Sequence, residues 1–238
     1  MTPVVWLYRL LLRQQLTLGR VALVGAMTLL TIVAAVGIAS SSDEALRMDD
    51  TTGFLWVFNI GLMVPIVSLV IASSSLGELV EDETLVYVWH RPTPRWVLAL
   101  AAWAAAATVA VPATTLPTFV GGIIGSGDAS VAIGGALAAA LGTLAYSGVF
   151  LLLGLLVRRA LIWGLVYVFV WEQFVARIGG TSARLSIGSY PSSVLAEITD
   201  IELPLAERGM TWGVIVPIAL AALAVALTSR TLDRIDVA

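Results

Sequence analysis

The sequence predicts an all-α, polytopic membrane protein whose helices cross the bilayer six times, and three observations lead to this prediction. The chain has 238 residues, of which 59% are hydrophobic and only 12% are charged, and its mean hydropathy is +0.96. A soluble domain usually carries about 25% charged residues to cover its surface. The apolar residues also fall into blocks of about 20, the length that a helix needs to cross a bilayer. We therefore expect a single membrane domain over residues 1–238.

The composition excludes several classes of chemistry. The chain has no cysteine and one histidine, His90, and all 13 basic residues are arginine. Without cysteine there is no disulfide, thiolate nucleophile or iron–sulfur ligand. One histidine cannot make a bis-histidine haem site, and without lysine there is no conventional nucleotide-binding P-loop. We expect no catalytic residue, no metal ligand and no bound cofactor in this chain.

The first segment, residues 1–20, is predicted to be an interfacial amphipathic helix. Arg9, Arg13 and Arg20 share one helical face, while apolar residues such as Leu7 and Leu11 occupy another. This pattern is typical of a helix that lies along the lipid headgroups. A signal peptide is the alternative, but the apolar stretch that follows is long and lacks a clear cleavage site, so we expect the segment to be retained.

Six apolar segments follow, separated by short polar stretches. They are Val21–Ala39, Phe54–Leu76, Trp96–Ile124, Val131–Val157, Leu161–Val175 and Gly213–Thr228. Residues 40–53 are expected to form an acidic loop. Pro65 should break the second span, and Pro112 and Pro117 should kink or interrupt the third, because proline removes a helical hydrogen bond.

Arginine placement predicts the orientation. If the N-terminus is inside, nine arginines lie in inner segments and four in outer ones, which is the asymmetry of the positive-inside rule. We expect both termini in the cytoplasm and the protein in the plasma membrane. In the fourth span, Gly134, Ala138 and Gly142 recur every four residues, which allows close helix packing; packing within the chain is favoured over a dimer contact.

Two polar residues inside the spans are candidates for a translocation path. Glu172, followed by Gln173, lies toward the outer end of the fifth span, and an ionisable group there is costly unless it has a function. Pairing with Arg177, or exposure at the outer interface, would also explain Glu172. Asn59 in the second span is a weaker candidate, since a hydrogen bond between helices would account for it.

The outer segment, residues 177–212, is predicted to contain one amphipathic helix. Val194, Leu195 and Ile198 share a face, with Ser192 or Ser193 as the N-cap after a proline.

The most informative stretch is GELVEDETLVYVWHRPTPRW, residues 77–96, between the second and third spans. Four acidic residues follow the span directly, on the side where basic residues are expected (Glu78, Glu81, Asp82 and Glu83). Negative charge gains nothing from anionic lipid, so the expected partner is a protein. Leu85 and Trp89 add apolar contacts, and a short amphipathic helix is expected. The alternative is a solvated connector.

This stretch resembles the permease subunits of ABC-2 type exporters, which carry E-x-x-G-T-L followed by P-x-x-R at this position. Glu81 matches the leading acid, Thr84 and Leu85 match T-L, Pro92 the proline and Arg95 the arginine. Glu83 departs from the pattern, since the family usually has glycine there. The order of an interfacial helix, six spans and a long outer segment is also similar.

The resemblance implies that residues 77–95 form a coupling helix, with Glu81, Thr84, Leu85, Trp89, Pro92 and Arg95 against a cytosolic ATPase. It further implies two ATPase subunits, which bind the ATP, and a second permease subunit that is identical or homologous. For residues 177–212 it implies outer re-entrant helices, and the alternative is an ordinary amphipathic loop that lies on the membrane.

The sequence leaves two other functions to consider. An ion-coupled transporter or channel would need intramembrane polar groups, of which Glu172 is the clear example. An intramembrane protease is disfavoured, because Ser147 would need a histidine at membrane depth and His90 lies in the cytoplasmic segment. The sequence does not indicate the cargo.

Overall fold

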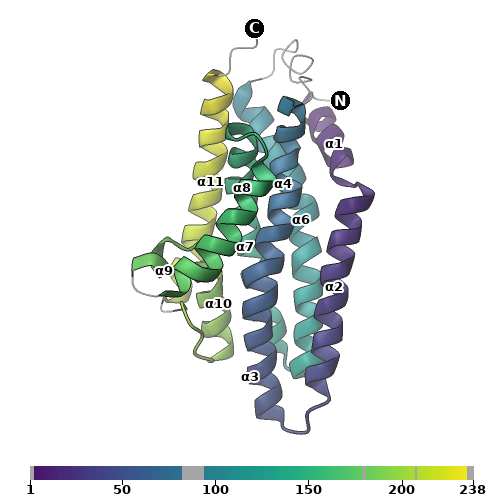
Figure 1. Ribbon diagram of the computed structural model, residues 1–238, viewed down its shortest axis with the longest axis vertical. Helices are drawn as coiled ribbons and strands as arrows, with labels where there is room; N and C mark the ends of the chain where they lie inside the picture. Colours follow the sequence, from purple (N-terminus) through teal and green to yellow (C-terminus); the bar gives the residue numbers. More distant parts are fainter. Residues whose placement is uncertain (1–2, 82–93, 179–180, 207, 235–238) are drawn as a thin grey trace.

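The computed structural model describes residues 3–81, 94–178, 181–206 and 208–234, and every regular element in these ranges is a helix. Within these ranges, six helical segments are long and apolar enough to cross a membrane: Leu18–Ala39, Glu44–Gly77, Arg95–Ser126, Ala129–Leu156, Ala160–Ile178 and Met210–Arg234. They form an elongated bundle with both chain ends at the same end (Figure 1). The prediction of an all-α, multi-pass membrane protein is confirmed.

The N-terminal segment forms a separate helix, α1 (Pro3–Gln15), which is followed by the first span, α2 (Leu18–Ala39). Leu7 and Leu11 are buried, and Arg9 and Arg13 are exposed, as the amphipathic pattern predicts. The predicted end at residue 20 is wrong. Arg20 belongs to α2, and its Nη1 donates to the Gln14 carbonyl at 2.6 Å across the break between the helices.

The second span begins ten residues earlier than predicted. It consists of α3 (Glu44–Phe54), the π-helical stretch η1 (Leu55–Met63) and α4 (Val64–Glu81). The acidic loop predicted over 40–53 is therefore wrong for most of its length. Asp43 caps α3, since its Oδ1 accepts from the backbone N–H groups of Ala45 at 3.0 Å and Leu46 at 3.3 Å. Thr51 and Thr52 are buried in the bundle, so one face of α3 packs although its sequence is polar.

The prolines do not interrupt the spans. Pro65 lies in the first turn of α4, directly after η1, and the chain continues as helix. The third span, α6 (Arg95–Ser126), contains Pro112 and Pro117 and is continuous. The predictions of a break in the second span and of an interruption in the third are therefore wrong.

A tight turn joins α6 to the fourth span, α7 (Ala129–Leu156), at the end of the bundle opposite the termini. Gly127 has φ +74, a left-handed conformation that suits glycine, and Nη2 of Arg47 donates to the Ser126 carbonyl at 2.9 Å. Asp128 caps α7 by accepting from the Ser130 N–H at 2.6 Å, and hydrogen bonds with Ser130 hold the pKa of Asp128 below its usual value.

The small residues of α7 pack within the chain, as favoured from the sequence. A Cβ at Gly134 would lie 3.2 Å from Ile198, and one at Gly142 would lie 3.1 Å from Val64. α7 contacts α4, α6, α10 and α11, and is therefore the central helix of the bundle.

The fourth span ends at Leu156, one residue before the predicted end, and Arg158 and Arg159 lie in the turn that follows. The fifth span consists of α8 (Ala160–Val166), a second π-helical stretch η2 (Tyr167–Val175) and the 3-10 turn η3 (Ala176–Ile178). Two short helices, α9 (Thr181–Leu185) and α10 (Ser189–Thr199), precede the last span, α11 (Met210–Arg234).

The predicted helix in the outer segment is present as α10, but its predicted N-cap is wrong. Gly188 is the N-cap, and Ser192 and Ser193 lie inside the helix. Their hydroxyls donate to the carbonyls four residues earlier, at 2.7 Å for Ser192 and 3.0 Å for Ser193. α10 packs against α7 and α11, with Val194 and Leu195 fully buried.

Candidate functional site

The predicted coupling segment lies between the end of α4 at Glu81 and the start of α6 at Arg95. Four of its six predicted contact residues, Thr84, Leu85, Trp89 and Pro92, lie outside the described residues. Glu81 is the last residue of α4, and its side chain is likewise outside the description. What can be described is how each end of the segment joins the bundle.

Arg95 fixes the start of α6 to the end of α11. Its Nη1 donates to the Leu232 carbonyl at 2.8 Å, and its Nε lies 4.0 Å from Oδ1 of Asp233. The last carbonyls of a helix have no partner within the helix, and a cation near them is favourable. Arg95 thus joins the third span to the sixth at the end that carries both termini.

The other end of the segment is fixed by backbone packing between α4 and α7. A Cβ on Gly154 would overlap the Ser73 carbonyl oxygen, and a Cβ on Gly77 would lie 3.2 Å from the Gly154 oxygen. Ser73 is buried, and its hydroxyl donates to the Leu69 carbonyl at 2.6 Å. The last turns of α4 before Glu81 therefore lie directly on α7, with no side chain between the two backbones.

Glu172 lies in η2, with 7% of its surface exposed. Its Oε1 accepts from the Tyr167 hydroxyl at 2.7 Å and from the Ile187 N–H at 3.0 Å, and its Oε2 accepts from the Ser186 hydroxyl at 2.5 Å. Two of these three donors belong to the connection between α9 and α10. Glu172 therefore links the fifth span to the outer segment.

The pairing with Arg177 considered from the sequence is not the contact that Glu172 makes. Nη2 of Arg177 instead donates to Oε1 of Gln173 at 2.7 Å, and the Arg177 guanidinium lies 5.1 Å from the ring centre of Trp56. Exposure of Glu172 at the outer interface is also wrong, because the side chain is buried.

Gln173 connects the two π-helical stretches. Its Nε2 donates to the Gly61 carbonyl in η1 at 2.6 Å. A cavity of about 30 Å³, enough for a water molecule, lies among Glu172, Gln173, Gly61 and Tyr146. π-Helical turns are rare and occur frequently at functional sites. Sequence reasoning missed Gly61, Tyr167 and Ser186, and the only signal nearby was the Glu-Gln pair within an apolar span.

Asn59 forms a second polar cluster, between η1, α2 and α6. Its side chain is fully buried, and its Nδ2 donates to Oγ1 of Thr118 at 3.0 Å and Oγ1 of Thr31 at 3.3 Å. Its Oδ1 has no hydrogen-bond partner among the residues that the structure describes. The hydrogen bond between helices that was expected for Asn59 is confirmed. Its partners are not those of Glu172, so the two candidate path residues belong to separate clusters.

Comparison with known proteins does not assign the chain to a family. The chain matches no protein-family model, and no curated protein is significantly similar to it. What the sequence and the structure establish together is a multi-pass helical membrane protein with six apolar helices.

Proposed function

We propose that this chain is the membrane-spanning permease subunit of an ATP-driven exporter of the ABC-2 type. The observation that carries the proposal is the stretch between the second and third spans, in which Glu81, Thr84-Leu85, Pro92 and Arg95 follow the spacing of that family. In this proposal a separate cytosolic subunit binds and hydrolyses ATP. Two such subunits act with a pair of permease chains, identical or homologous, in the plasma membrane.

The way in which both ends of residues 77–95 are attached to the helix bundle supports this proposal. α4 leads into it while packed on the backbone of α7, and α6 leads out of it with Arg95 bonded to the end of α11. A force applied between Glu81 and Arg95 would therefore act on four spans. A loop that only connected two spans would not need either attachment.

The outer segment has a place in the same proposal. We assign α9 and α10 as the outer re-entrant helices of the exporter, which close the path on the outer side. The hydrogen bonds of Glu172 to Ser186 and Ile187 would hold this closure against the fifth span. The proposed orientation has both termini in the cytoplasm.

The proposal is tested by purifying the tagged chain from the membranes of its native cells and sequencing the proteins that copurify with it. We expect the ATPase to copurify, and its activity to depend on the membrane subunit. The variants Glu81→Ala and Pro92→Ala should each weaken this association at least about fivefold, as truncation of an interface contact commonly does. Glu197→Ala, an exposed carboxylate on α10, is the matched control and should bind normally.

Transport by the purified chain alone, with no ATPase present, would overturn the proposal. Copurification that is unaffected by both loop variants would remove the coupling role of residues 77–95. The orientation is checked separately by fusing a reporter that fluoresces only in the cytoplasm to either end.

An ion-coupled secondary transporter is the second candidate, and the observation that favours it is the buried Glu172. It predicts proton-dependent uptake by the chain alone in liposomes, abolished by Glu172→Gln. If uptake is absent, or is retained in Glu172→Gln, this candidate is rejected.

A further inference from the structure

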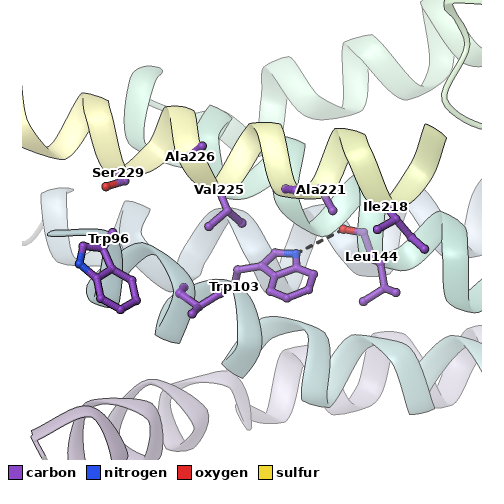
Figure 2. Close-up of a pocket in the computed structure, with 10 residues that line it drawn as sticks. Trp96, Trp103, Leu144, Ile218, Ala221, Val225, Ala226 and Ser229 are labelled. Atoms are coloured by element: carbon purple, nitrogen blue, oxygen red, sulfur yellow. Dashed lines mark hydrogen bonds between the residues drawn. The ribbon is translucent and has the colours of Figure 1, made fainter. Parts of the chain in front are cut away.

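An apolar groove runs along the surface between α6 and α11, with α7 behind it (Figure 2). Its volume is about 370 Å³, and its walls include Trp96, Leu100, Trp103, Ile218, Ala222 and Val225. The indole N–H of Trp103 donates to the Leu144 carbonyl at 3.3 Å, so this polar atom is satisfied within the protein. The groove therefore presents almost entirely hydrocarbon to whatever fills it.

The groove has the length of one membrane leaflet. Figure 2 shows Trp96 and Ser229 at one end and Ile218 at the other. From Ser229 to Ile218 the helix α11 rises about 16 Å, at about 1.5 Å per residue. Half of the hydrocarbon core of a bilayer is about 15 Å thick. Trp96 and Ile218 remain 60% and 51% exposed, so the groove opens toward lipid.

Among the described residues, two arginines of α11 lie beyond one end of the groove. Arg230 and Arg234 are exposed on the last turns of α11, at the end of the bundle that carries both termini. Arg230 follows Ala226, a groove residue, by one helical turn, so it continues the same flank beyond the apolar walls. Trp96 at this end has the amphipathic ring that favours the membrane–water interface.

We propose that this groove binds one acyl chain of an anionic phospholipid, with the headgroup at Arg230. The apolar walls match the chain in chemistry and in length, and the arginine matches a phosphate or another negative group in charge. The site does not depend on the exporter assignment, because it requires only a bilayer and the described geometry of α6, α7 and α11.

The test uses the purified full-length protein in detergent, with native mass spectrometry to count retained lipid after addition of phosphatidylglycerol or phosphatidylcholine of the same acyl composition. Ala222→Phe fills the groove, and Ala26→Phe, on the exposed face of α2, is its matched control. Arg230→Gln removes the charge, and Arg158→Gln, at an exposed position in the turn after α7, is its matched control.

We expect the wild-type protein to retain one phosphatidylglycerol molecule in preference to phosphatidylcholine, and Ala222→Phe to retain neither. Arg230→Gln should lower the preference for phosphatidylglycerol about fivefold, the effect of one arginine near a charged lipid surface. Both control variants should behave as wild type.

Three results would overturn the proposal. Lipid retention that is unchanged in Ala222→Phe would mean that the groove is not the site. A headgroup preference that is unchanged in Arg230→Gln would remove the anionic assignment. Conversion of a dimer to a monomer by Ala222→Phe, with lipid retention unchanged, would mean that a second copy of the chain occupies the groove.

Discussion

The two π-helical stretches each carry one buried polar side chain, and these two side chains are satisfied to different degrees. Glu172 in η2 accepts hydrogen bonds from Tyr167, Ser186 and Ile187, and the last two belong to the connection between α9 and α10. Asn59 in η1 donates to the hydroxyl oxygens of Thr31 and Thr118 and to the Met63 sulfur, and its own oxygen accepts no hydrogen bond from the described residues. The hydrogen-bond partners of Glu172 and of Asn59 also differ in whether they would keep another hydrogen bond if that side chain were removed.

The threonine partners of Asn59 donate their own hydroxyl hydrogens within their helices. Thr31 bonds to the Met27 carbonyl at 3.0 Å, and Thr118 bonds to the Thr114 carbonyl at 2.7 Å. The Ile187 N–H, in contrast, bonds to Glu172 at 3.0 Å, and a buried backbone donor without a partner is costly. The comparison indicates that Glu172 holds the outer segment in place, while Asn59 aligns three spans with little net stabilisation.

The largest expected effect is that of Glu172→Ala. It would leave the Tyr167 hydroxyl, the Ser186 hydroxyl and the Ile187 N–H without their acceptor, which we expect to cost about 3 kcal/mol of unfolding free energy. Glu172→Gln, which keeps one acceptor oxygen, should fall between this variant and wild type. Reversible unfolding in mixed micelles measures both values, and Glu197→Ala is the exposed control. Equal stability of Glu172→Ala and wild type would contradict the role assigned to this carboxyl group.

A smaller effect is expected for Ser186→Ala, which removes one of the donors to Glu172. Hydrogen bonds between helices in membrane proteins average about 0.6 kcal/mol, with a maximum near 1.7. We expect a loss of about 1 kcal/mol in the same unfolding measurement. A smaller loss is expected when Ser186→Ala is added to Glu172→Ala, because only the bond from the Ser189 N–H to the Ser186 oxygen is then left to lose. Additive losses in the double variant would show that Ser186 acts independently of Glu172. Ser40→Ala, on the exposed end of α2, is the control.

The smallest effect is expected for Asn59→Leu. The Oγ1 atoms of Thr31 and Thr118 each lose the hydrogen bond that they accept from Asn59, but both hydroxyls still donate within their own helices. The substitution also removes the unpaired Asn59 oxygen. The unfolding free energy should therefore change by less than about 0.5 kcal/mol. Asn59→Asp, which buries an acidic group at the same place, should be much less stable. A loss in Asn59→Leu as large as that of Glu172→Ala would erase the difference between the two clusters.

The six spans could be predicted from the sequence because apolar length alone identifies them, but their ends depend on tertiary contacts. The start of the second span was missed because residues 44–53 are acidic and polar, and what keeps them helical is the Asp43 cap and the burial of Thr51 and Thr52. The two π-helical stretches have no periodic signal in the sequence.

The partners of the candidate path residues likewise could not be predicted from the sequence, because they depend on tertiary contacts. The sequence places Glu172 in an apolar span but leaves exposure at the outer interface as an alternative, and its partner Ser186 lies 14 residues further along, beyond the end of that span. Only the folded chain brings the two together. The assignment of residues 77–95 stays a prediction, because most of its contact residues lie outside the described part of the chain.

The contact between Ser73, Gly77 and Gly154 has a mechanical consequence. Two helices separated by side chains can slide, because rotamers adjust, but two backbones in direct contact have nothing between them that can yield. α4 and α7 should therefore move as one rigid lever. Whatever pulls on the chain after Glu81 pulls on the central helix of the bundle as well.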